Sequence, residues 1–128
     1  KGKPGYVEGD WASLEEAIEW INAAGGLAVI AHPARYRLSA TRLRELMSTF
    51  KELGGTGLEV ISGSHSDKEN RSMAGYARRY DLAASMGSDF HGAHHPWRQI
   101  GKMSDLPENL SPVWKCKQWP VFAGSVSV

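Results

Sequence analysis

Two short runs of the sequence place side chains that can bind a metal where an apolar stretch ends. His32 follows the apolar residues 27–31, and Asp89 and His91 come soon after the largely apolar residues 82–86. Imidazole and carboxylate groups are suitable ligands for zinc, manganese or iron. Neither run would be persuasive alone, but together they predict a metal site that serves hydrolysis.

The same residues also have simpler interpretations. A lone histidine before a proline, such as His32, is more often a hydrogen-bonded or exposed loop residue than a ligand, and Asp89 could cap a turn. Asp89 and His91 are two residues apart, so both side chains would point to the same side of an extended backbone. Because the two runs recur at predicted strand ends, we expect His32, Asp89 and His91 to be metal ligands.

Alternating helix and strand patterns supply the elements that position these residues. A Ser-x-x-Glu capping pattern at Ser13 predicts a helix over about 13–24, which a glycine pair ends. The continuously apolar residues 27–31 then predict a strand buried on both faces. Helical spacing recurs over 43–53, where a second glycine pair follows.

The pattern continues with a strand at 56–61, a second capping box at 66–69 and a strand at 82–86. Such repeats predict the α/β class, with about three βα units, parallel strands and right-handed crossovers. The carboxyl ends of parallel strands form the ligand-binding face, so we expect His32 to meet residues from the two other strand ends there. Glu59 is expected to be only a partner for Arg35 or part of the interior.

Length and charge exclude several classes of protein. A chain of 128 residues can bury a core but is too short for an eight-stranded barrel, which needs roughly 250 residues. A formal charge of +1 argues against a nucleic-acid sponge or an acidic tail. The single cysteine, Cys116, forms no intrachain disulfide, and no apolar run has the length of a signal sequence or membrane span. We therefore expect a cytoplasmic protein without a membrane partner.

Residues 25–33 and 87–92 resemble the third and fourth motifs of the PHP (polymerase and histidinol phosphatase) superfamily. Within it, residues 32–36 and 57–65 resemble the branch of nucleoside 3′,5′-bisphosphate phosphatases that are also 5′→3′ exoribonucleases on short RNA. The resemblance implies a distorted (β/α)7 barrel with two or three metal ions at the strand carboxyl ends. Manganese is the expected metal, and zinc, iron and magnesium are alternatives.

By this resemblance His32 is the third-motif ligand, and Asp89 and His91 are the fourth-motif ligands. The family's first motif, a His-x-His pair, and the ligands that follow it precede the third motif, whereas no histidine precedes His32 here. The chain therefore resembles the carboxyl-terminal half of a family member, whose partner would be the missing amino-terminal half of the same barrel. We expect the chain alone to be inactive.

The resemblance also implies a division of the chain. We expect residues 1–10 to be a connector from the missing half, residues 11–118 to be the carboxyl-terminal portion of the barrel, and residues 119–128 to be a tail. Five tryptophans could be mistaken for a base-stacking surface, but we expect them to pack the tail and helices. These are Trp11, Trp20, Trp97, Trp114 and Trp119.

Several residues near the predicted ligands could bind a phosphate ester. Arg35 could clamp a phosphate in a bidentate way, or it could be a solvated loop charge. Tyr36 could stack on a base, and His65 or His94 could hydrogen-bond the phosphate or protonate the leaving oxygen. His91 and His65 are the candidate catalytic residues.

We thus expect the intact protein to be a metal-dependent phosphoesterase that hydrolyses nucleoside 3′,5′-bisphosphates and short RNA in the 5′→3′ direction. A histidinol-phosphate-type phosphatase and a non-catalytic module of the same fold are the alternatives. A serine hydrolase is the weakest rival, because the sequence has no Gly-x-Ser-x-Gly elbow. Ser88, Asp89 and His91 are also too close in sequence to form a triad.

Overall fold

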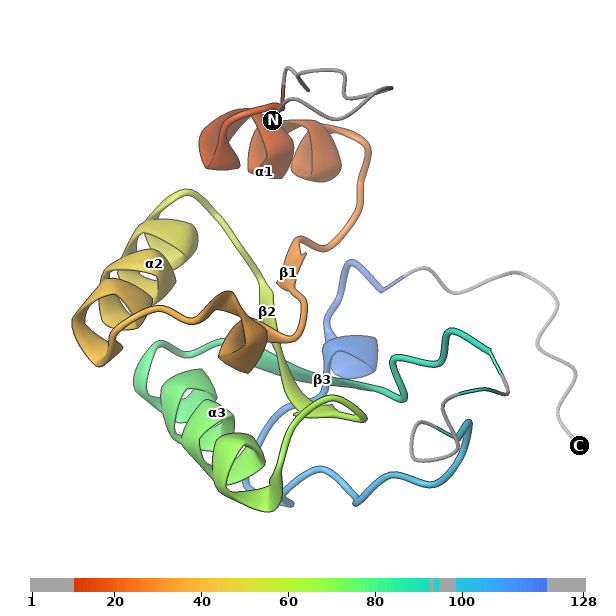
Figure 1. Ribbon diagram of the computed structural model, residues 1–128. Helices are drawn as coiled ribbons and strands as arrows, with labels where there is room; N and C mark the ends of the chain where they lie inside the picture. Colours follow the sequence, from red (N-terminus) through yellow and green to blue (C-terminus); the bar gives the residue numbers. More distant parts are fainter. Residues whose placement is uncertain (1–10, 93, 95–98, 120–128) are drawn as a thin grey trace, which may run out of the picture.

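The computed structural model describes residues 11–92, 94 and 99–119. In this part of the chain, helices alternate with the strands of a parallel sheet whose order is β1–β2–β3 (Figure 1). The elements are α1 (Leu14–Ala23), β1 (Val29–Ile30), the 3₁₀ helix η1 (Pro33–Tyr36), α2 (Ala40–Glu52), β2 (Gly57–Ser62), α3 (Asp67–Arg79), β3 (Ala83–Gly87) and the 3₁₀ helix η2 (Val113–Lys115). The α/β class and the parallel strands are confirmed. The predicted connector 1–10 and residues 120–128 of the predicted tail lie outside the described residues.

The predicted capping boxes begin two of the helices. At α1 the Ser13 hydroxyl accepts a hydrogen bond from the Glu16 amide at 3.1 Å, and the Ser13 amide donates to the Glu16 carboxylate at 2.8 Å. Ser66 and Glu69 form the same reciprocal pair at the start of α3. Each pair satisfies amides that the first turn of a helix leaves without partners, which fixes where the helix begins.

The glycine pairs follow the carboxyl-terminal ends of α1 and α2, as predicted. At α2 the Gly55 amide donates to the Phe50 carbonyl at 2.8 Å, and Gly54 has a left-handed φ of 89°. A Cβ atom at Gly55 would overlap the Phe50 ring, so the chain can pass this close to the helix only at a glycine. The tight turn leads directly into β2.

Strand β2 lies at the centre of the core. All six of its residues are buried, which is the pattern of a strand covered on both faces of a parallel sheet. Its apolar side chains pack in one cluster with residues from the helices, among them Ile18, Met47 and Met73. On the outer side of β3, the Ala84 amide donates to the Ser111 carbonyl at 2.7 Å, so residues 111 and 112 lie along this strand.

Strand β1 differs from its prediction. The apolar residues 27–31 were expected to form a strand buried on both faces, but β1 has only two residues, and Val29 keeps 36% of its surface exposed. Ile30 on the other face is buried. The reason is that β1 pairs with β2 alone in the described part of the chain, so only one of its edges and one of its faces are covered. No helix among the described residues is long and apolar enough to span a membrane.

Candidate functional site

The carboxyl ends of the three strands bring the predicted site residues to one edge of the sheet. His32 follows β1, His65 follows β2, and Asp89 and His91 follow β3 (Figure 1). Because the strands are parallel and neighbouring, their carboxyl ends lie at the same edge. The loops after β2 and β3 also touch: the Gly63 amide donates to the Gly87 carbonyl at 3.0 Å.

His32 adopts a backbone conformation that is uncommon for a residue with a side chain. Its φ of 33° and ψ of 54° lie in the left-handed region, and it caps the start of η1. Such a conformation costs roughly 1–2 kcal/mol for a residue other than glycine, and such strain clusters at functional sites. The Nδ1 atom of His32 is buried and has no hydrogen-bond partner among the described residues, while its ring lies edge-on to Tyr36 with the ring centres 6.2 Å apart.

A buried carboxylate supports this turn. Glu59, on β2, is only 8% exposed, and its Oε2 atom accepts a hydrogen bond from the His32 amide. Hydrogen bonds to a charged group contribute about 1.5–3 kcal/mol, which is enough to offset the cost of the left-handed residue. Of the two expectations for Glu59, a place in the interior is confirmed, whereas no ion pair joins it to Arg35 among the described residues. The hydrogen bond to His32 was not predicted, although one charged residue inside an apolar strand was a usable signal.

Asp89 and His91 lie close together, but for a different reason from the one expected. Asp89 has a φ of 52°, so the backbone turns here and is not extended. Through this turn the His91 Nδ1 atom lies 2.7 Å from the Asp89 carbonyl oxygen and 3.5 Å from its carboxylate. Aspartate tolerates the left-handed region better than most residues, which explains why the turn forms at this position. The Asp89 side chain is mostly covered, whereas that of His91 is 65% exposed.

His65 and Arg35 lie near the first turn of α3. Both ring nitrogens of His65 are buried without hydrogen-bond partners among the described residues. The pKa of Glu69 is lowered below its usual value, first by hydrogen bonds from the Ser66 amide and hydroxyl and then by the positive charges of His65 and Arg35. Arg35 and His65 therefore both act on one carboxylate in the first turn of α3. The Arg35 side chain itself is exposed.

The remaining predicted residues lie at the border of this edge. Tyr36 is 40% exposed, and its pKa is raised by burial and then by the negative charge of Glu59. His94 is exposed, and a Cβ atom at Gly92 would lie 2.7 Å from its ring. Tyr36 thus lies beside His32, and His94 folds back toward the loop after β3.

The described residues have the right donors for a divalent metal but do not form a complete site. No three His, Cys, Asp or Glu side chains in residues 11–92, 94 and 99–119 lie close enough to hold a metal ion. A buried imidazole nitrogen without a partner is costly unless it binds something, and such atoms occur at His32 and His65. The covered carboxylate of Asp89 is a further donor at this edge, and imidazole and carboxylate donors suit zinc, manganese or iron. These residues could therefore supply some of the ligands of a metal site, and other residues would have to supply the rest.

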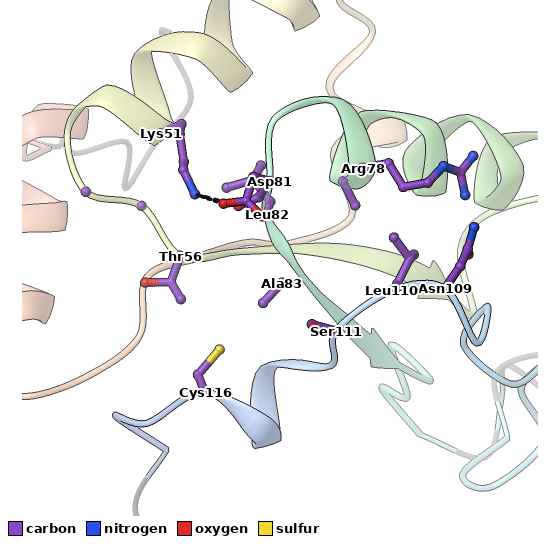
Figure 2. A pocket seen from close by; sticks show the side chains of 13 residues that line it. Lys51, Thr56, Arg78, Asp81, Leu82, Ala83, Asn109, Leu110, Ser111 and Cys116 are labelled. Atoms are coloured by element: carbon purple, nitrogen blue, oxygen red, sulfur yellow. Dashed lines mark hydrogen bonds and ion pairs between the residues drawn. The ribbon is translucent and has the colours of Figure 1, made fainter.

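A cavity of the described residues lies elsewhere. It has a volume of about 620 Å³ and lies before the amino ends of β2 and β3, at the opposite edge of the sheet (Figure 2). Its walls include Thr56, Ser111 and Cys116, and the Lys51 ammonium lies 3.3 Å from the Asp81 carboxylate on one side. A second cavity of about 370 Å³ lies beside α3. Neither contains a predicted site residue, so the size of these cavities does not identify the site.

No known family model matches the chain. The sequence is 49% identical over 114 residues to a 3′,5′-nucleoside bisphosphate phosphatase of Chromobacterium violaceum, covering 89% of this chain and 40% of the relative. It is 42% identical over 120 residues to the 5′-3′ exoribonuclease Rnm of Escherichia coli, covering 94% of this chain and 41% of the relative. The chain thus spans about two fifths of the length of the curated relatives it matches.

Two solved structures also match most of this chain and about two fifths of their own length. An amidohydrolase from Chromobacterium violaceum, solved with bound sulfate and no metal, matches with a TM-score of 0.78 and 49% identity over 88% of this chain and 39% of that chain. A protein from Bifidobacterium adolescentis, named provisionally as a metal-dependent phosphoesterase, matches with a TM-score of 0.58 and 30% identity over 88% of this chain and 37% of that chain. The chain corresponds to the carboxyl-terminal part of its relatives.

Proposed function

Because the relatives of this chain fit the PHP-superfamily branch of nucleoside bisphosphate phosphatases and exoribonucleases, and the chain spans their carboxyl-terminal part, we propose that it forms half of such an enzyme. The intact protein would be a metal-dependent phosphoesterase that hydrolyses nucleoside 3′,5′-bisphosphates and short RNA in the 5′→3′ direction. The amino-terminal half of the barrel would be its partner within the same protein.

The observation that carries the proposal is that the carboxyl edge of the sheet has buried histidine nitrogens with no hydrogen-bond partner among the described residues. His32 and His65 come from different strand ends, and Asp89 comes from the third. Buried polar atoms of this kind are rare unless they bind a ligand or ion. This edge is also where parallel α/β sheets bind their ligands.

His32, Asp89 and His91 would hold the metal, together with donors from the amino-terminal half. A bound divalent metal cluster supplies a nucleophile at neutral pH and neutralises charge on the phosphoryl oxygens. Manganese is the proposed ion. The mixed imidazole and carboxylate donors also suit zinc and iron, whereas magnesium prefers oxygen ligands. A cytoplasmic location is likewise a proposal.

The other residues would bind and orient the phosphate ester. The guanidinium of Arg35 matches the geometry of a phosphate, and both Arg35 and His65 act on the Glu69 carboxylate, so the two side chains would contact the phosphate from the same side of the site. His65 can donate a proton to the leaving oxygen. His91 was also a candidate for this step, but its Nδ1 lies at the Asp89 carbonyl, so its other ring nitrogen would be taken up by the metal and His91 would act as a ligand. Tyr36 and His94, at the border of the edge, would contact the base and the remaining phosphate.

A histidinol-phosphate-type phosphatase would use a similar set of ligands. No feature of the described residues favours that substrate, whereas the names of the relatives support the nucleotide substrate. A non-catalytic module would be expected to lose ligand residues, yet His32, Asp89 and His91 are all present.

The test is manganese-dependent release of phosphate from adenosine 3′,5′-bisphosphate by the intact protein, with 5′-phosphorylated short RNA as a second substrate. We expect Asp89→Asn to lower kcat/KM by at least about 100-fold, because it removes the charge of a ligand. The matched control is Asp81→Asn at the opposite edge of the sheet, which should leave kcat/KM unchanged. Equal activity of Asp89→Asn and the unmodified protein would contradict the proposal.

The 128-residue chain alone should release no phosphate, since its described residues lack three donors that could hold a metal together. Manganese-dependent release by this chain, abolished by Asp89→Asn, would show that the incomplete site can assemble without the other half, for example by association of two chains.

A further inference from the structure

The carboxylate of Glu59 lies between the two strand ends that carry the predicted ligands. One oxygen, Oε2, accepts a hydrogen bond from the amide of His32 at the end of β1. The other, Oε1, lies next to the end of β3, where a Cβ atom at Gly87 would be only 3.0 Å away. The side chain therefore spans from the central strand to both of its neighbours.

An irregularity of the sheet places Glu59 in this position. β2 and β3 pair in register up to Glu59 and Ser85, and the register then shifts, so that Ile61 pairs with Met86. A bulge of this kind re-aims side chains, and bulges are common beside active sites. Val60 is the residue of β2 that has no paired residue on β3. Its side chain is fully buried, so packing in the core stabilises the bulge.

A buried carboxylate needs compensation for its lost hydration. Among the described residues no lysine or arginine forms an ion pair with Glu59. The hydrogen bond from the His32 amide therefore compensates part of the hydration that the carboxylate loses on burial. The carboxylate is thus directed at the backbone of a predicted ligand and faces the edge where cations would bind.

We infer that Glu59 is a positioning residue: it fixes the left-handed turn at His32 and sets the spacing between the ends of β1 and β3, so that His32 and Asp89 are held ready for the metal. This inference rests on the proposed function. It assigns Glu59 no contact with the substrate and no proton transfer. Outer groups that orient ligands typically contribute 10–100-fold to metal affinity.

Two variants separate the charge of Glu59 from its hydrogen bond. Glu59→Gln keeps the length and one oxygen acceptor but removes the charge, whereas Glu59→Leu removes the acceptor as well. The matched control is Glu108→Gln, an exposed position outside the site. Because Glu59→Leu could fail to fold, thermal unfolding is followed for each variant, and the conclusion can be drawn from Glu59→Gln alone.

The first readout is the amide proton resonance of His32 in the intact protein labelled with ¹⁵N-histidine, assigned by its loss in His32→Asn. A hydrogen bond to a carboxylate moves this resonance downfield, so Glu59→Gln should move it upfield and Glu59→Leu further. The second readout is the manganese dissociation constant from calorimetry, which should rise about 10–100-fold in Glu59→Gln. Glu108→Gln should change neither.

An unchanged His32 resonance in Glu59→Gln and Glu59→Leu would overturn the inference, and so would a moved resonance with unchanged manganese affinity and kcat. If the unmodified protein binds no manganese and releases no phosphate, the proposed function fails and the role of Glu59 fails with it. The His32 resonance would still report the hydrogen bond in that case, so the two failures can be told apart.

Discussion

Two residues other than glycine have a left-handed backbone at the strand ends of the candidate site. A left-handed backbone alone does not identify this site. His32 and Asp89 have φ values of 33° and 52°, yet Arg37 and Asp81 are also left-handed, and Asp81 lies at the opposite edge of the sheet. What distinguishes His32 is the combination of a strained backbone with a buried ring nitrogen that has no hydrogen-bond partner in the described part of the chain. Strain becomes informative about function when such an atom accompanies it.

Gly63 allows the loops after β2 and β3 to touch. A Cβ atom there would overlap the Ser88 carbonyl oxygen, which is backbone and cannot rotate away. We predict that Gly63→Ala lowers the free energy of unfolding by about 1–3 kcal/mol, as overpacking does. Urea unfolding measures this effect.

Gly75→Ala is the control for this substitution, because a Cβ atom at Gly75 in α3 meets nothing within 4 Å. Alanine favours a helix over glycine by about 1 kcal/mol, so this variant should be neutral or more stable. Equal stabilities of Gly63→Ala and Gly75→Ala would show that the two loops can separate at no cost.

At this scale the sequence identified residue types better than their geometry. His32, Asp89 and His91 could be selected because each follows an apolar run, and the run lengths are visible in the sequence. The turn at Asp89 and the bond from His32 to Glu59 could not be predicted, since they depend on strand pairing and on the bulge in β2. Whether the three residues bind a metal stays a prediction.

At the scale of elements, local signals determine where the helices begin and end. Ser13 and Ser66 are N-caps because their hydroxyls reach the amides of the first turn, three residues away. Such contacts depend only on neighbouring residues, which is why both capping boxes and both glycine pairs were predictable. The extent of β1 was not, because its burial depends on what covers its outer edge and face.

The capping box of α3 predicts a pH-dependent stability. In the folded state, hydrogen bonds from Ser66 lower the pKa of Glu69 below 4.5, so this pair contributes stability above that pH and loses it as the pH falls through the lower folded value. We predict that Ser66→Ala costs about 1 kcal/mol of unfolding free energy at pH 7.

The difference between Ser66→Ala and the unmodified protein should shrink as the pH falls below 4.5 and through the lower folded pKa of Glu69, because Glu69 then becomes protonated in both. Chemical unfolding at a series of pH values measures it. Ser72→Ala, at an exposed position within the same helix, is the control and should show no such pH dependence. A difference that stays constant down to pH 3 would show that Glu69 is not part of the effect.

At the scale of the whole molecule, large apolar side chains are exposed around α1. Trp11 is 89% and Trp20 is 61% exposed, and Leu14 and Ile21 are also exposed. The prediction that the tryptophans pack is therefore wrong for Trp11 and Trp20. Trp114 and Trp119 are 45% and 42% exposed, so more than half of each residue is covered, and Trp97 lies outside the described residues. Exposed apolar patches of this kind mark interaction surfaces.

We predict that the 128-residue chain alone associates with itself through this face of α1. Sedimentation velocity should show dimers or larger species at micromolar concentration, and Trp20→Gln combined with Ile21→Gln should shift them toward monomer, because apolar contact area is lost. Glu19→Gln on the same helix is the control. A chain that stays monomeric without these substitutions would contradict the prediction.

The strand order has a consequence for how the protein is made. Each strand pairs with the next one along the chain, so a single α-helix lies between the two strands of each parallel pair. The sequence separation of paired residues is therefore small, which favours fast pairing. As the chain leaves the ribosome from its amino end, β1 can dock on β2 before β3 has been synthesised. Asp89 and His91 follow β3 and therefore reach this edge last, so any cation held there by all three strands would bind only after this segment has folded.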